Sequence, residues 1–127
     1  MAALFQIGFW IPFAFSTYFA LVPDPPEYPV FQVSDVILHG AAFTYLTFAF
    51  ALAQYENYDP RRLYVRSFVL MLAYGLLIEI AQSFVPERSA ELKDLFVDVL
   101  GIGLGILMTV YFAGPLRQLA ARLLVRR

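Results

Sequence analysis

The amino-acid sequence predicts an all-α, polytopic membrane protein, a four-transmembrane-helix bundle with short loops. Of its 127 residues, 61% are hydrophobic and 15% are charged, whereas soluble domains carry about 45–50% apolar and about 25% charged residues. Four stretches contain no Asp, Glu, Lys or Arg apart from Glu79: residues 1–23, 36–55, 67–86 and 99–116. Each reaches or nearly reaches the roughly 20 apolar residues that cross the hydrocarbon core as a helix.

This composition excludes a soluble domain, a disordered chain and a nucleic-acid binder with a basic face. The chain contains no Cys, which excludes disulfide frameworks and thiolate metal sites. Membrane lipids are therefore the first expected partners.

We expect one domain over residues 1–127, with helices at about 3–22, 35–55, 65–85 and 93–113. Proline-rich residues 23–29 form the first connection, and Asp59-Pro60 is a turn signal in the second. Residues 86–92 form the third connection. Gly114-Pro115 is expected to end the fourth helix, which leaves a basic tail at 114–127.

The distribution of Lys and Arg predicts the topology, because basic residues are retained on the cytoplasmic side. Seven of the nine lie beside the second connection or in the tail, so both termini are expected in the cytoplasm. These seven are Arg61, Arg62, Arg66, Arg117, Arg122, Arg126 and Arg127. The tail either lies along the inner membrane surface on an apolar helical face or is a simple basic stop signal.

Polar residues inside the spans are the informative ones, because ionisable groups there are costly and face the bundle interior by default. His39, Glu79 and Asp98 lie on three different predicted helices. At about 1.5 Å per residue, each sits roughly 6–9 Å below the outer rim. The sequence therefore predicts one polar layer to which three helices contribute.

Helical spacing adds further polar residues to the same faces. Asp35 and His39 are four residues apart, Glu79 and Gln82 three apart, and Asp94 and Asp98 four apart. Such a layer supports general acid–base chemistry, binding of a divalent cation, or recognition of a polar headgroup. Alternatively, the polar groups bond only to each other and hold the helices together. The excess of acids over bases favours a functional site.

Gly101 and Gly105 form a small-xxx-small pair on the broad face that carries Asp94 and Asp98. Such a pair lets two helices approach closely. We expect the neighbouring helix to belong to the same chain rather than to a second subunit.

The pattern that several of these residues form resembles that of the VanZ-like membrane proteins. In that family an Asp-Lys-x-x-His segment opens the second helix, a Glu-x-x-Gln pair followed by Arg closes the third, and an Asp-x-x-x-Asn segment starts the fourth. The corresponding residues here are Asp35, His39, Glu79, Gln82, Arg88 and Asp94. The resemblance spans residues 34–107 and implies the four-helix fold and the polar site.

Three positions depart from the family pattern. The Lys is Val36 here, a Tyr expected later in the second helix is Phe43, and the Asn is Asp98. The layer is therefore more acidic than the family pattern. A role that needs that cation, or a neutral amide at position 98, does not carry over.

We therefore expect a multi-pass protein of the bacterial inner (cytoplasmic) membrane. Its outward-facing polar cleft would bind or process a cell-envelope or lipid-linked headgroup, such as that of a cell-wall precursor. The family is named for a factor in glycopeptide resistance towards teicoplanin-type drugs, so the resemblance also implies a link to that resistance.

The predicted catalytic residues are His39 and Glu79, as acid or base, with Asp35 orienting His39. Arg88 would hold an anionic group such as phosphate. The predicted substrate-binding residues are Gln82, Arg88, Asp94 and Asp98. No cofactor is assigned, although a divalent cation at the carboxylates is one alternative.

Two other functions compete with this one. The first is a non-enzymatic assembly or scaffold factor, in which the polar residues only join helices. The second is a small proton or ion conduit. A conduit needs ionisable groups at successive depths, and the inner halves of the spans are nearly free of them, which counts against transport.

The predicted topology is testable with single cysteines in this cysteine-free chain. Cysteines in place of Tyr28 and Ser89 should react with an impermeant thiol reagent in intact cells, while one in place of Asn57 should not. Labelling at Asn57 alone would reverse the topology.

Overall fold

The computed structural model describes residues 1–23, 35–86 and 90–125, and the Asp35 side chain is not described. Four α-helices follow one another: α1 (Ala2–Leu21), α2 (Asp35–Gln54), α3 (Pro60–Gln82) and α4 (Leu92–Val125). No strand occurs in the described ranges. All four helices are long and apolar enough to cross a membrane, so the predicted all-α, four-span fold is confirmed.

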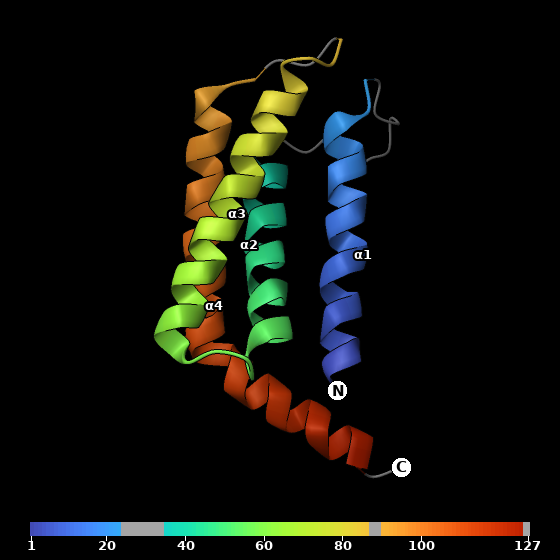
Figure 1. Cartoon of the computed structure of the whole chain (residues 1–127), viewed down its shortest axis with the longest axis vertical. Coiled ribbons are helices and arrows are strands. Elements are labelled where there is room, and N and C mark those ends of the chain that lie inside the picture. The colour runs from blue at the N-terminus through green and yellow to red at the C-terminus, as the bar shows by residue number, and fades with distance from the viewer. Residues whose placement is uncertain (24–34, 87–89, 126–127) are drawn as a thin grey trace.

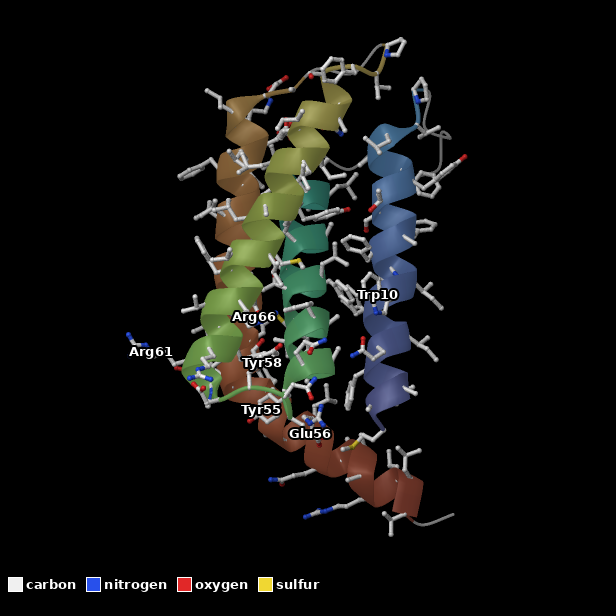
Figure 2. The ribbon with its side chains drawn as sticks, in the orientation of Figure 1. Trp10, Tyr55, Glu56, Tyr58, Arg61 and Arg66 are labelled. Atoms are coloured by element: carbon white, nitrogen blue, oxygen red, sulfur yellow. The ribbon has the colours of Figure 1, made fainter. Side chains whose placement is uncertain are left out.

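The four helices run alternately up and down beside one another (Figure 1). α2 packs against each of the other three, and its contact with α4 is the most extensive in the bundle. α1 begins and α4 ends at the same end of the bundle, where α2 also passes into α3 (Figure 1). We call this the basic end, because Arg61, Arg62, Arg66 and Arg117 lie there. Figure 2 shows Arg61 and Arg66 at this end, beside Tyr55, Glu56 and Tyr58.

α3 begins five residues earlier than predicted. The Asp59 side chain accepts a hydrogen bond from the backbone N–H of Arg62 at 3.1 Å and so caps the helix. Pro60 occupies the first turn, where its missing N–H is not needed. The pair Asp59-Pro60, interpreted as a turn signal, is therefore a helix start. At its other end α3 stops at Gln82 rather than at residue 85.

α4 continues past Gly114-Pro115 to Val125, so the predicted end at residue 113 is wrong. The helix bends in this region and passes beneath the other helices (Figure 1). Arg117, in the first turn after the proline, is buried. Its Nη1 donates to the Leu52 carbonyl at 2.7 Å, its Nη2 pairs with Glu56, and its guanidinium lies over the Tyr55 ring. These contacts hold the segment after Pro115 against the bundle.

α1 is held mainly by aromatic side chains. Phe9 is its one buried residue and packs edge-on against Phe50 of α2, with ring centroids 5.4 Å apart. Phe13 packs on Tyr74 of α3 at 4.6 Å. The Tyr74 hydroxyl also shares a hydrogen bond with Thr17 at 2.8 Å. α1 is therefore less buried in the bundle than α2, α3 and α4.

Two glycines of α4 set the distance to α2. A Cβ at Gly101 would lie 2.6 Å from the Gly40 carbonyl oxygen, and one at Gly105 would lie 2.6 Å from that of Thr44. Both distances are shorter than real Cβ atoms tolerate. The glycine pair therefore packs within the chain, and α4 lies directly against the α2 backbone.

Replacing Gly101 with Ala should lower stability, because the methyl group must displace the backbone of α2; such overpacking costs about 1–3 kcal/mol. The matched control is Gly103→Ala, where a Cβ meets nothing within 4 Å. Thermal unfolding in detergent should show a lower Tm for Gly101→Ala and an unchanged or higher Tm for Gly103→Ala. Equal Tm values for the two variants would contradict this packing.

Candidate functional site

The acidic layer consists of His39 of α2, Glu79 of α3, and Asp94 and Asp98 of α4. His39 lies in the second turn of α2, Asp94 and Asp98 lie in the first two turns of α4, and Glu79 lies in the last turn of α3. Because the helices alternate in direction, all four residues lie at the end opposite the basic end. One ligand atom from each of His39, Glu79 and Asp98 lies within 4.8 Å of the others. Three helices thus converge at one depth, as the sequence spacing predicts.

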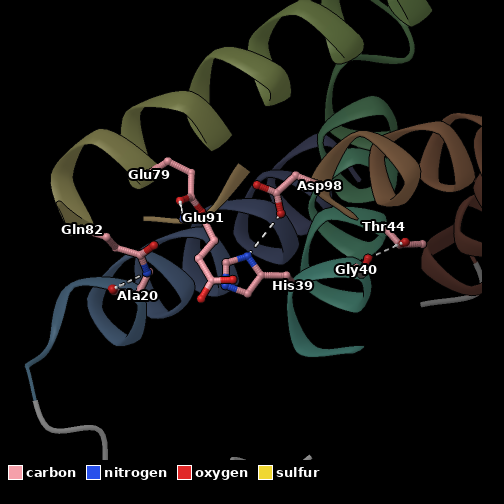
Figure 3. Close-up of polar contacts among 8 residues, drawn as sticks. All are labelled: Ala20, His39, Gly40, Thr44, Glu79, Gln82, Glu91 and Asp98. Atoms are coloured by element: carbon pink, nitrogen blue, oxygen red, sulfur yellow. Dashed lines mark hydrogen bonds and ion pairs between the residues drawn. The ribbon is translucent and has the colours of Figure 1, made fainter. Parts of the chain in front are cut away.

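His39 and Asp98 form the one direct side-chain pair of the layer. The His39 Nδ1 lies 3.2 Å from Asp98 Oδ1 and joins α2 to α4 (Figure 3). Asp98 is 1% exposed, and its second oxygen, Oδ2, has no hydrogen-bond partner among the described residues. A Cβ at Gly75 would lie 3.0 Å from this oxygen. The glycine in α3 therefore makes room for the carboxylate.

Within the described ranges, Glu79 is attached through one of its two carboxylate oxygens. Its Oε2 accepts a hydrogen bond from the backbone N–H of Glu91 at 3.1 Å, immediately before α4 (Figure 3). Its Oε1 is buried and has no partner in the described ranges. Glu79 thus connects the end of α3 to the start of α4 and keeps one oxygen for another contact.

Asp94 adds a third buried carboxylate. It is 9% exposed, and its Oδ1 also lacks a partner among the described residues. The neighbouring Lys93 pairs through its Nζ with a carboxylate oxygen of Glu91 at 2.8 Å, and both of these side chains are exposed. Among the described residues, His39 contacts one of these acids directly, Asp98.

Gln82 has a contact that the sequence does not reveal. Its Nε2 donates to the carbonyl of Ala20 at 2.9 Å and ties the end of α3 to the end of α1 (Figure 3). Its predicted role in substrate binding stays a prediction. Arg88 and the Asp35 side chain lie outside the described residues, so the predicted contact of Asp35 with His39 also stays a prediction. The partner that the structure gives His39 is Asp98.

Tyr74 is a neighbour of the layer that the sequence analysis missed. Its ring packs beside that of Phe43, with centroids 5.6 Å apart. Phe43 stands where the family pattern has a tyrosine, so a phenol from α3 lies next to the position where α2 lacks one. The signal that could have indicated it is a tyrosine five residues before Glu79, in the same predicted span.

An apolar groove of about 530 Å³ runs between α2 and α4 beside the acidic layer. At the depth of the layer it is bounded by Gly40 and Val97, which adjoin His39 and Asp98 in the chain. It continues towards the basic end between Phe48 and Met108. Its walls are therefore apolar, as contact with a hydrocarbon chain requires, and one end lies at the depth of the acidic layer.

Comparison with known proteins identifies one family. A family model described as VanZ/LLP1 matches residues 2–113, which covers the four helices up to the bend in α4. The resemblance predicted from the polar residues is thereby confirmed. No curated protein and no solved structure matches the chain.

One carboxylate oxygen of Glu79 has a hydrogen-bond partner and the other has none among the described residues. We therefore expect two substitutions of Glu79 to change the thermal stability in different ways. In a Glu79→Gln variant the amide oxygen can still accept from the Glu91 N–H, while one charge is removed from among the acids. We expect its Tm in detergent to equal or exceed that of the parent. Glu79→Leu removes the acceptor and should cost about 0.5–1.5 kcal/mol, the net contribution of one hydrogen bond. A Gln variant that melts well below the parent would make Glu79 chiefly a structural residue.

Proposed function

Because the chain belongs to the VanZ/LLP1 family, we propose that it binds the headgroup of a cell-envelope lipid at the acidic layer. The observation that carries the proposal is the set of three buried carboxylates, Glu79, Asp94 and Asp98, each with an oxygen that lacks a partner among the described residues. Buried polar groups in native structures are nearly always paired. Unpaired oxygens from two helices at one depth favour a ligand.

The depth of the layer supports a headgroup rather than a soluble substrate. Its residues lie within about two turns of the helix ends, or roughly 3–9 Å along the axis. This is the zone beneath the membrane surface where the headgroup of a lipid meets its hydrocarbon chains. The apolar groove between α2 and α4 begins at the same depth and suits one chain of the same lipid.

Orientation and cellular role complete the proposal. The Arg distribution supports both termini in the cytoplasm of a bacterium, and with that orientation in the inner membrane the acidic layer would lie in the outer half of the bilayer. A lipid-linked cell-wall precursor presents a phosphate-bearing headgroup there. Arg88 is the predicted partner of that phosphate. Lower susceptibility to teicoplanin-type glycopeptides is the cellular consequence that we expect of this binding.

The alternative function as an assembly or scaffold factor is favoured by two contacts. Gln82 bonds to the Ala20 carbonyl and Glu79 to the Glu91 N–H, and both contacts join helix ends without using a ligand. Under this alternative Asp98→Asn, which keeps the size of the side chain, would leave lipid binding unaffected.

Lipid binding is measured with the purified protein in nanodiscs. The probes are a polyprenyl phosphate and a phosphatidylcholine, whose phosphate is capped by choline. We expect saturable binding of the polyprenyl phosphate, and an affinity changed by at least about tenfold, equivalent to 1.4 kcal/mol, in Glu79→Gln and Asp98→Asn. Asp59→Asn at the basic end is the matched control, because Asn also caps a helix. Equal binding of both lipids, or binding unchanged in both layer variants, would contradict the proposal.

A further inference from the structure

The acidic layer contains more negative charge than its described contacts compensate. Asp98, Glu79 and Asp94 are 1%, 8% and 9% exposed, and each has one buried oxygen without a partner among the described residues. An isolated carboxylate in an apolar interior is strongly unfavourable unless it is paired, protonated or bound to a metal. A bound cation, or a proton on one of the acids, would offset this charge.

The positions of three side chains favour a metal cation as the ligand of the layer. One ligand atom from each of His39, Glu79 and Asp98 lies within 4.8 Å of the other two. Ligand atoms held by one Zn²⁺ at about 2.0–2.2 Å stand roughly 3–4 Å apart, so movements of about 1 Å would close the set. We propose that His39, Glu79 and Asp98 bind a divalent transition-metal cation of the Zn²⁺ or Mn²⁺ type.

The two oxygens available for the cation are on different helices. Glu79 Oε1 and Asp98 Oδ2 have no partner in the described ranges, and Figure 3 shows the two carboxylates and the His39 ring in one close-up, with the His39–Asp98 contact as a dashed line. Glu79 Oε2 and Asp98 Oδ1 are held by the Glu91 N–H and by His39. These bonds fix each carboxylate in place and leave its other oxygen for a metal.

The donor types favour a borderline cation over Mg²⁺ or Ca²⁺. An imidazole nitrogen with two carboxylate oxygens suits Zn²⁺ and Mn²⁺, whereas Mg²⁺ and Ca²⁺ prefer oxygen alone. The N-termini of α2 and α4 oppose any cation with about half a positive charge each. Three carboxylates, with up to one negative charge each, outweigh that opposition.

A metal at this position also explains how an acidic layer accepts a phosphate, and this step rests on the proposed function. Three protein ligands leave a coordination position of the ion open. A phosphate oxygen of the headgroup can fill it, so that the cation lies between the carboxylates and the phosphate. Without the cation, the same carboxylates would repel the phosphate.

Metal binding is tested on protein purified in detergent with a tag that lacks histidine and stripped with a chelator. Isothermal titration with ZnCl₂ should show about one ion per chain, and the Tm should rise on binding. His39→Gln, Glu79→Gln and Asp98→Asn should each weaken binding by at least about tenfold, since even indirect partners of a metal contribute 10–100-fold. Asp59→Asn should bind as the parent does. Three separate layer variants keep the test decisive if one of them fails to fold.

Two results would overturn the metal site. The first is no saturable Zn²⁺ binding by the parent protein, and the second is Zn²⁺ binding by all three layer variants with the affinity of the parent. Polyprenyl phosphate binding is measured in parallel, with and without chelator. Binding that persists in the stripped protein would refute the metal bridge while the proposed function stands. Zn²⁺ binding without any polyprenyl phosphate binding would refute the proposed function while the metal site stands.

Discussion

The close contact between α2 and α4 is the constraint on which the acidic layer depends. Gly101 and Gly105 let α4 lie against the carbonyls of Gly40 and Thr44. Only at that separation does Asp98, one turn before Gly101, come within 3.2 Å of His39. Larger side chains at the glycines would move the helices apart and separate the pair. In a bilayer, where lipid is as apolar as the helix surface, such close packing is the main source of helix association.

The helix termini partly stabilise the charges that this contact brings together. α2 and α4 both begin at the end of the bundle that carries the acidic layer. Each N-terminus contributes about half a positive charge, which favours nearby carboxylates. Asp94 lies in the first turn of α4 and Asp98 in the second. This effect falls off within a turn, so it serves Asp94 better than Asp98 and leaves most of the burial cost of Asp98 to His39 and to any occupant.

Features that depend on composition and on position along a helix can be predicted from the sequence. Features that depend on contacts between helices cannot. The four spans and the common level of His39, Glu79 and Asp98 follow from charge-free stretches and the rise of a helix. Asp59-Pro60 fits a turn as well as a helix cap, so the start of α3 was misplaced. The continuation of α4 past Pro115 depends on Arg117 reaching the Leu52 carbonyl and Glu56, a contact between residues 65 positions apart. The bond between Gln82 and Ala20 is of the same kind.

Buried charges have more partners at the basic end of the bundle than at the opposite end. This difference helps to explain the unpaired oxygens of the acidic layer. At the basic end, Arg117 is buried with a carbonyl, a carboxylate and two aromatic rings around its guanidinium. At the other end, each of three buried carboxylates has an oxygen without a partner in the described ranges. The chain can thus build a well-compensated charge within the same four helices. Loose packing is therefore a poor explanation for the open oxygens of the layer. A site that keeps acceptors free for a ligand accounts for them better, because a purely structural network gains stability from every contact it completes.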